Sequence, residues 1–409
     1  MSGERDVAVW ARIGVLSFGG PAGQIALMHR ELVERRAWID EARFLHALNF
    51  CMLLPGPEAM QLATYIGWLR GGWRGGLLAG GLFVLPGALA ILALSWVYVL
   101  AGDLDWIAGA FFGLKAAVIA IVAQALLRIG RKALKNWLQA GIALAAFAAL
   151  FLFGLPFPLV VLAAAAIGFV QARGGAVTAA PAPVSTGRVA LVWLVLWLGP
   201  VAAMVLGLGA DHVLARVAVY FSQMAVLTFG GAYAVLAWVA QAAVERFDWL
   251  SAAQMLDGLA LAETTPGPLI LVTQFVGFMA GWGAGGLAMA SLAGLVATWV
   301  TFAPCFLWIF AGAPHAERLR GNPALAGALS AVTAAVVGVI ANLGLWFALH
   351  TLFGRVEGGW PVWSSFDPWA AGLVALALVA AFGARLGAGA LILGGAAAGM
   401  ALGLAGLAG

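Results

Sequence analysis

The sequence has very little charge. Only 9% of its 409 residues are Asp, Glu, Lys or Arg, whereas 64% are hydrophobic. A soluble globular domain carries roughly 25% charged residues, so this composition excludes one and indicates a polytopic membrane protein in a lipid bilayer. The formal net charge of +4 comes from scattered basic residues, and no basic run carries interleaved aromatic residues. We therefore expect no nucleic-acid partner.

Residues that bind metals or perform redox chemistry are also scarce. The chain has two cysteines, Cys51 and Cys305, both in apolar segments, and five histidines without ligand spacing. No phosphate-binding or dinucleotide-binding glycine loop occurs. No catalytic constellation lies in the apolar segments, which argues against a membrane-embedded enzyme. We expect no metal, no cofactor and no enzymatic activity. The first residues also lack the pattern of a cleavable signal peptide.

The chain is instead a series of apolar runs long enough to cross roughly 30 Å of hydrocarbon. A linker rich in Ala, Pro and Gly, residues 173–188, splits them into two groups. Two paths remain open. Either every run spans the membrane, or residues 7–28 and 44–69 re-enter as hairpins, which places more Lys and Arg on the cytoplasmic side. The runs lie near residues 7–28, 44–69, 75–100, 106–127, 137–153, 157–172, 189–208, 213–243, 254–280, 284–310, 324–350, 369–384 and 386–408.

The two halves of the chain repeat one another. Val15–Gly20 reads VLSFGG and Val226–Gly231 reads VLTFGG, while Pro55–Pro57 and Pro266–Pro268 both read PGP. Both pairs are 211 positions apart without a gap, which indicates an internal duplication.

The orientation of the copies follows from counting runs. Each half has an even number of apolar runs, and the run at 189–208 has no counterpart. This extra run reverses the second copy, which predicts an all-α fold of two homologous halves in an inverted-topology repeat. We expect residues 1–172 to form the first transporter repeat, 173–212 a linker plus connecting transmembrane helix, and 213–409 the second repeat.

Four helix-breaking motifs, two FGG and two PGP, lie inside the apolar runs. Proline removes a backbone donor and breaks a helix, and the helix that follows begins with free N–H groups that can bind an anion. Irregular backbone at membrane depth is tolerated only inside protein or along a wet cavity. The motifs therefore predict re-entrant or broken helices that meet at an anion site between the repeats. Simple kinks with close helix packing are the alternative.

Ionisable residues accompany the motifs. Glu58 follows the first PGP and Glu263 precedes the second, and intramembrane carboxylates are candidates for carrying protons. Glu58 could instead stabilise the N-terminus of its helix. Lys115 lies within an apolar run and would attract an anion or pair with a glutamate, unless it snorkels to the interface.

A second basic group lies at the end of one run. We interpret Arg128, Arg131, Lys132 and Lys135 as a cytoplasmic flank that sets the topology.

Together, SFGGP and LPGPEAMQLATYIGW, with TFGGAYAVL and TTPGPLILVTQFVG in the second half, resemble the chromate ion transporter family in its long two-domain form. The resemblance covers essentially the whole chain. It implies a secondary transporter of the cytoplasmic (inner) membrane that exports chromate, a tetrahedral oxyanion like sulfate, and so confers chromate resistance. The second half departs from the first, because Ala232 stands at the position of Pro21 and Leu269 at that of Glu58. A fully symmetric site is therefore not expected.

We predict an antiporter that exports chromate with the proton gradient, with sulfate uptake or chromate/sulfate exchange as the alternative and a passive anion channel as another. The expected partners are chromate or sulfate, protons and the bilayer, and a homodimer is left open. Glu58 and Glu263 are the predicted proton-coupling residues. The predicted substrate-binding residues are Phe18, Gly19, Gly20, Pro21, Gln24, Asn49, Pro55, Gly56, Pro57, Lys115, Phe229, Gly230, Gly231, Thr264, Thr265, Pro266, Gly267 and Pro268.

Overall fold

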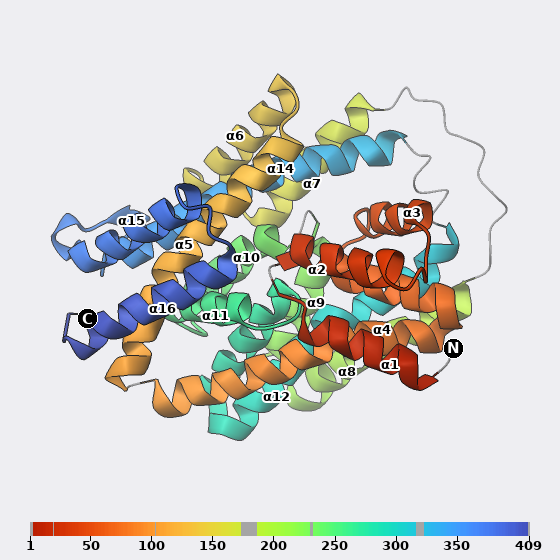
Figure 1. Cartoon of the computed structure of the whole chain (residues 1–409), viewed down its shortest axis with the longest axis horizontal. Coiled ribbons are helices and arrows are strands. Elements are labelled where there is room, and N and C mark those ends of the chain that lie inside the picture. Colours follow the sequence, from red (N-terminus) through yellow and green to blue (C-terminus); the bar gives the residue numbers. More distant parts are fainter. Residues whose placement is uncertain are drawn as a thin grey trace.

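The computed structural model describes residues 3–18, 20–102, 104–172, 186–229, 232–315 and 323–407. In these ranges the chain is almost entirely helical (Figure 1), apart from a short antiparallel pair of strands, β1 (Val356–Glu357) and β2 (Trp360–Pro361). The first half contains α1 (Gly3–Val15), α2 (Gly20–His29), η1 (Arg30–Glu34), α3 (Glu41–Cys51), α4 (Glu58–Ala101), α5 (Asp105–Ala133), α6 (Trp137–Phe151) and α7 (Phe157–Gln171). After α8 (Gly187–Leu208) come α9 (Val213–Leu227), α10 (Ala232–Gln241), η2 (Ala242–Arg246), α11 (Ala252–Thr264), η3 (Leu269–Leu271), α12 (Val272–Gly312), η4 (Ala313–His315), α14 (Pro323–Leu352), η5 (Trp363–Ser365), α15 (Pro368–Phe382) and α16 (Ala388–Leu404).

Several of these helices are long and apolar enough to cross a membrane. They are α4, α5, α8, the continuous stretch η3–α12, and α14. Helix α8 also leaves large apolar side chains such as Leu191, Val195 and Leu206 exposed on the surface, as expected of residues that face lipid. The predicted all-α, multi-pass membrane protein is confirmed at this level.

Helices α4 and α12 each contain a sharp turn at a pair of glycines. Gly72 has φ +59° and Gly286 has φ +71°, a backbone conformation that favours glycine. A straight helix of 44 residues would be roughly 66 Å long, about twice the hydrocarbon thickness. The chain folds back instead, since a Cβ added at Gly67 would lie 2.4 Å from the carbonyl oxygen of Gly75. Each of these stretches is therefore a short helix packed closely against a long one.

The described residues of the four predicted motifs lie at or between helix ends. The FGG motifs separate α1 from α2 and α9 from α10, and the PGP motifs separate α3 from α4 and α11 from η3. The apolar runs that contain them are therefore each two shorter helices. In Figure 1 the start of α1 and the loop between α2 and α3 lie on the same side of the molecule, at right.

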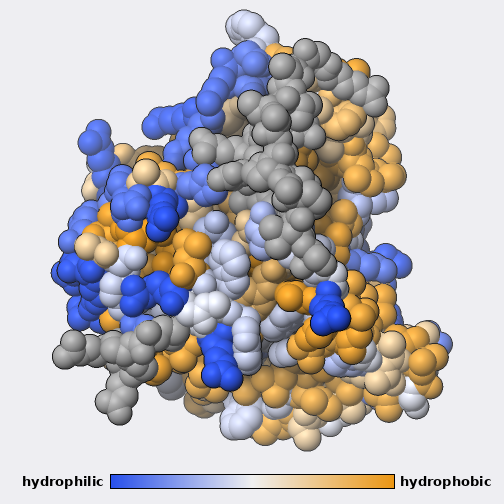
Figure 2. Space-filling model, turned by 90° about the vertical axis from the view of Figure 1, so that its right-hand side faces the viewer, coloured by the Kyte–Doolittle hydropathy of each residue, from blue (hydrophilic) through white to orange (hydrophobic). Residues whose placement is uncertain are grey.

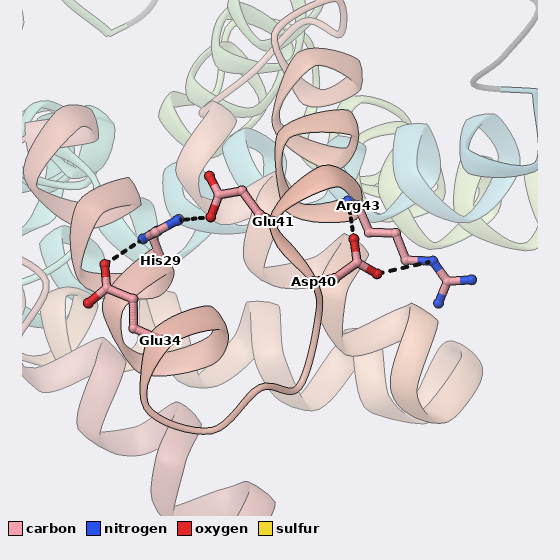
Figure 3. Close-up of polar contacts among 5 residues, drawn as sticks. All are labelled: His29, Glu34, Asp40, Glu41 and Arg43. Atoms are coloured by element: carbon pink, nitrogen blue, oxygen red, sulfur yellow. Dashed lines mark hydrogen bonds and ion pairs between the residues drawn. The ribbon is translucent and has the colours of Figure 1, made fainter.

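The loop between α2 and α3 is held by ion pairs (Figure 3). The Nδ1 atom of His29 lies 3.1 Å from Glu34 Oε1, and its Nε2 atom lies 2.5 Å from Glu41 Oε2. Asp40 caps α3 by accepting a hydrogen bond from the Arg43 amide at 2.8 Å. Figure 2 shows this side of the molecule, where hydrophilic side chains gather on one part of the surface beside apolar areas.

The corresponding loop in the second half has the same backbone. Ala37 has φ +47° and Asp248, 211 positions later, has φ +51°. Positive φ is uncommon for residues other than glycine, so its recurrence at equivalent positions is specific. Both loops also follow a π-helical turn, η1 and η2. The repeat in the sequence is thus a repeat in local structure.

The halves exchange helices to build the core. Helix α5 of the first half packs against α15 and α16, while α14 of the second half packs against α6 and α7. The backbones of these helices approach one another closely. A Cβ added at Gly113 would lie 1.9 Å from the Gly395 carbonyl oxygen, and one at Gly168 would lie 2.2 Å from the Gly327 carbonyl oxygen. Small residues that permit such approach are typical of packed membrane helices. The two halves therefore form one intertwined unit.

Candidate anion-binding site

Each PGP turn is hydrogen-bonded to the FGG break of the other half. The amide of Gly56 donates to the Thr228 carbonyl at 2.8 Å, and the amide of Gly267 donates to the Ser17 carbonyl at 2.9 Å. The donors are 211 positions apart, and so are the acceptors. Gly56 and Gly267 have φ +116° and +98°, which glycine adopts most readily. This reciprocal pair of bonds brings the two kinds of motif together across the interface between the halves.

Two glutamine side chains fix the same turns. The Nε2 atom of Gln24 donates to the Gly267 carbonyl at 2.7 Å and lies 3.3 Å from the Ser17 carbonyl. The Nε2 atom of Gln61 donates to the Pro55 carbonyl at 2.6 Å. These bonds satisfy carbonyls that the helix breaks would otherwise leave without a partner. Gln24, predicted to bind substrate, therefore contacts backbone here.

A cavity of about 370 Å³ lies beside these breaks, and we call it the cation-lined cavity. The first residues of three helices, α2, α4 and α10, line it, together with the last turns of α5 and the first turns of α14. A helix N-terminus carries free N–H groups and the positive end of the helix dipole. The lining residues are Pro21, Ala22, Ile25, Leu48, Met52, Leu54, Gly56, Glu58, Arg128, Ile129, Lys132, Ala133, Phe229, Ala232, Tyr233, Leu329, Val332 and Thr333.

Arg128 and Lys132 supply two full positive charges to this wall. They are one helical turn apart, so they lie on one face of α5. Among the residues that the structure describes, no carboxylate lies within 4 Å of either cation. The sequence interpretation as a topology flank missed this position, because it ended the apolar run at residue 127 whereas α5 continues to Ala133. Their spacing of four residues was the available signal.

Two carboxylates belong to the same region. Glu58, the first residue of α4, lines the cavity directly. Glu263 is buried and lies behind Tyr233, whose hydroxyl donates to Glu263 Oε1 at 2.5 Å. Arg128 also acts electrostatically on Glu263. The arrangement places two cations and one carboxylate on the wall of one cavity, with a second carboxylate behind that wall.

Lys115 has a different partner from the one that the sequence left open. Its ammonium lies 3.4 Å from Asp257 Oδ1, and the Tyr98 hydroxyl donates to Asp257 Oδ2 at 2.9 Å. Lys115 is not one of the residues that line the cation-lined cavity. Asp257 was not singled out in the sequence, because it lies nine residues before the second PGP motif, on another helix from Lys115.

The remaining predicted residues divide by position. Pro21, Gly56 and Phe229 line the cavity with Glu58. Asn49 and Phe18 are exposed and are not among the residues that line it, and the hydroxyls of Thr264 and Thr265 donate to carbonyls of their own helix. The second PGP packs on α4, since a Cβ added at Gly87 would lie 2.2 Å from the Pro266 carbonyl oxygen. Gly20 begins α2, Pro57 precedes α4 and Pro268 precedes η3. Lys115 pairs with Asp257 as described above. The other predicted residues, Gly19, Gly230 and Gly231, lie outside the described residues.

Comparison with known proteins gives a consistent result. The family model for the chromate transporter matches residues 7–169 and 215–400 of this chain. The chain is 36% identical to the chromate transport protein of Pseudomonas aeruginosa, over 83% of this chain and 80% of the relative. It is 31% identical to the chromate transport protein of Cupriavidus metallidurans, over 82% of this chain and 80% of the relative. No solved structure matches.

Proposed function

This chain belongs to the chromate transporter family, and we propose that it is a secondary transporter that exports chromate from the cytoplasm. Members of the family are transporters rather than enzymes. The observation that carries the proposal is the cation-lined cavity, where Arg128, Lys132 and three helix N-termini face one space. Every one of these groups favours an anion. Export would take place across the cytoplasmic membrane and give chromate resistance.

The size of the cavity suits a hydrated oxyanion. One water takes about 30 Å³ in the liquid, so about 370 Å³ accommodates a tetrahedral oxyanion of five heavy atoms together with several waters. Chromate would accept hydrogen bonds from the guanidinium of Arg128 and the ammonium of Lys132, and from backbone N–H groups at the start of α2 and α10. Lys115 would reach an anion only when its pair with Asp257 opens.

Proton coupling would act through the two carboxylates. A dianion in the cavity is repelled by an ionised Glu58 or Glu263 and is tolerated when the carboxylate is protonated, so anion and proton occupancy depend on one another. Protonation of Glu263 would affect the cavity through Tyr233, which lines the cavity wall and donates a hydrogen bond to Glu263. In an antiporter, protons would enter from the far side as chromate leaves.

We further propose that the halves form an inverted-topology repeat. Residues 1–172 would be the first transporter repeat, 173–212 the linker and connecting helix α8, and 213–409 the second repeat. The reciprocal hydrogen bonds of Gly56 and Gly267 support a two-fold relation between the halves. In the re-entrant path, α1 with α2 and α3 with the first part of α4 are hairpins whose turns meet near the midplane. Labelling of Ala37→Cys from the cytoplasmic side is expected, and periplasmic labelling would exclude this path.

Transport and coupling can be tested in everted membrane vesicles that contain the protein. Uptake of chromate, stimulated by a proton gradient, is expected, since uptake into everted vesicles corresponds to export. Glu263→Gln should keep chromate binding but lose the stimulation, whereas Glu357→Gln, the same change at an exposed glutamate outside the site, should behave as wild type. Equal chromate uptake with and without the proton gradient would contradict proton coupling.

Sulfate is the second candidate substrate, because the cavity chemistry suits any tetrahedral dianion. Competition of sulfate with chromate, together with the direction of net flux, separates export of chromate from sulfate uptake or chromate/sulfate exchange. Inward sulfate flux without chromate transport would replace the proposed function with this alternative.

A further inference from the structure

A second cavity lies at the other ends of the helices that line the first one. Its volume is about 580 Å³, and its walls include Gln241 and Glu245 near the end of α10, and Asn342, Trp346 and His350 near the end of α14. Helices α10 and α14 also line the cation-lined cavity, but with their first turns, at Tyr233 and Thr333. The two cavities therefore lie along the same two helices.

The stretch between them is apolar and closed. On α14, Thr333 and Asn342 are half-buried, whereas all residues from 334 to 340 are buried, including Val336, Val339 and Ile340. Thr333 and Asn342 are nine positions apart along the helix, a distance of roughly 14 Å. A short apolar layer between two cavities has the form of a hydrophobic gate.

The repeat relates the two cavities to each other. Gly130 of α5 and Gly344 of α14 occupy equivalent places in the two halves, 214 positions apart, as do Gly113 and Gly327. At this offset Arg128, Ile129 and Lys132 correspond to Asn342, Leu343 and Trp346. The first three line the cation-lined cavity and the other three line the second cavity. Equivalent faces of equivalent helices thus build both cavities.

We propose that the second cavity is the vestibule on the opposite side of the membrane, which receives the tetrahedral oxyanion after it passes the apolar layer of α14. This inference rests on the proposed function. The vestibule binds the oxyanion weakly, because Asn342 and Trp346 replace the two cations and Glu245 adds a negative charge to the wall. Tight binding on one side and weak binding on the other favours release from the second cavity.

Cysteine accessibility tests this path in membrane vesicles of both orientations. Cys51 and Cys305 are buried, so the wild type provides the unlabelled background. With a membrane-impermeant maleimide, Thr333→Cys should be labelled from one side only and Asn342→Cys only from the other, while Val336→Cys should be labelled from neither. Labelling of Thr333→Cys and Asn342→Cys from the same side would overturn the proposal.

Function provides the second measurement. Attachment of the maleimide to Asn342→Cys should reduce chromate flux at least tenfold, because the reagent fills the vestibule. Ser364→Cys is the matched control, since Ser364 is exposed in the segment between α14 and α15 and does not line the cavity. Equal flux in the two labelled variants would refute the vestibule. If the wild type carries no chromate, the proposed function fails, whereas the labelling pattern still decides the path.

Discussion

Removal of the Arg128 charge should weaken chromate binding without unfolding the protein. In Arg128→Gln the side chain keeps a polar end but loses its positive charge and its planar pair of donors. Arg128 is exposed to the cavity and has no ion-pair partner within 4 Å among the described residues, so its loss breaks no direct contact with a buried carboxylate. The substitution should therefore lower the affinity for chromate and leave the stability of the protein nearly unchanged.

The expected size follows from the contact that is lost. A hydrogen bond to a charged group contributes about 1.5–3 kcal/mol, and each 1.4 kcal/mol is tenfold in affinity. Because the Arg128 side chain is exposed, the lower half of this range applies, which gives about 10- to 40-fold weaker binding. Arg128→Lys keeps the charge and should lose only a few-fold. The difference should shrink at high ionic strength, since mobile ions screen a solvated charge.

The assay combines transport and binding. The KM for chromate uptake is measured in everted vesicles, and chromate binding is measured on the protein purified in detergent. Lys135→Gln is the matched control, because Lys135 belongs to the same basic group but follows the end of α5, is exposed and does not line the cavity. It removes the same charge from the same surface of the molecule.

One result would refute the reasoning. If Arg128→Gln and Lys135→Gln change the KM equally, the basic group acts as a general surface charge and the cation-lined cavity is not the binding site. If Arg128→Gln and Lys132→Gln each raise the KM whereas Lys135→Gln does not, the two cations bind the same ligand. The double variant should then be less than additive, as for residues that contact a common partner.

Three further predictions concern packing, buried charge and pH. Gly87→Ala should destabilise the protein by about 1–3 kcal/mol through overpacking, because a Cβ there would lie 2.2 Å from a backbone oxygen of the second PGP motif, while Gly81→Ala, which meets nothing within 4 Å, should be neutral in thermal unfolding in detergent. Lys115→Met should cost about 3–5 kcal/mol because it leaves the buried Asp257 unpaired, and addition of Asp257→Leu should restore much of the loss; no recovery would contradict a simple ion pair. The hydrogen bond to Glu41 raises the pKa of His29 above its ordinary value of 6.5, so this contact stabilises the loop fully below pH 6.5 and is lost as the pH rises through the raised pKa. Hydrogen exchange of residues 30–40 should accordingly speed up above that pH in the wild type, beyond the intrinsic rate, and His29→Gln should abolish the change.

Local chemistry made the helix breaks readable in the sequence. Proline and glycine act within one or two residues, so the PGP and FGG motifs ended helices where they were expected to. The composition likewise determined the class, because a chain with so few charged residues is typical of a protein in a bilayer and not of a soluble domain. The turn at Gly71 and Gly72 was also readable, because it lies in the gap between the runs predicted at 44–69 and 75–100, beside Arg70 and Arg74.

The partners of the charged residues came only from the tertiary structure. Lys115 meets Asp257 because α5 packs beside α11, and Arg128 and Lys132 face the motifs because the halves exchange helices around α5 and α14. These residues are far apart in the sequence, and no local pattern encodes which faces meet. The sequence therefore determined the membrane class, the duplication and the places where helices break. The packing between the halves decided which cations, carboxylates and helix ends share one cavity, since long-range contacts depend on the whole arrangement of helices.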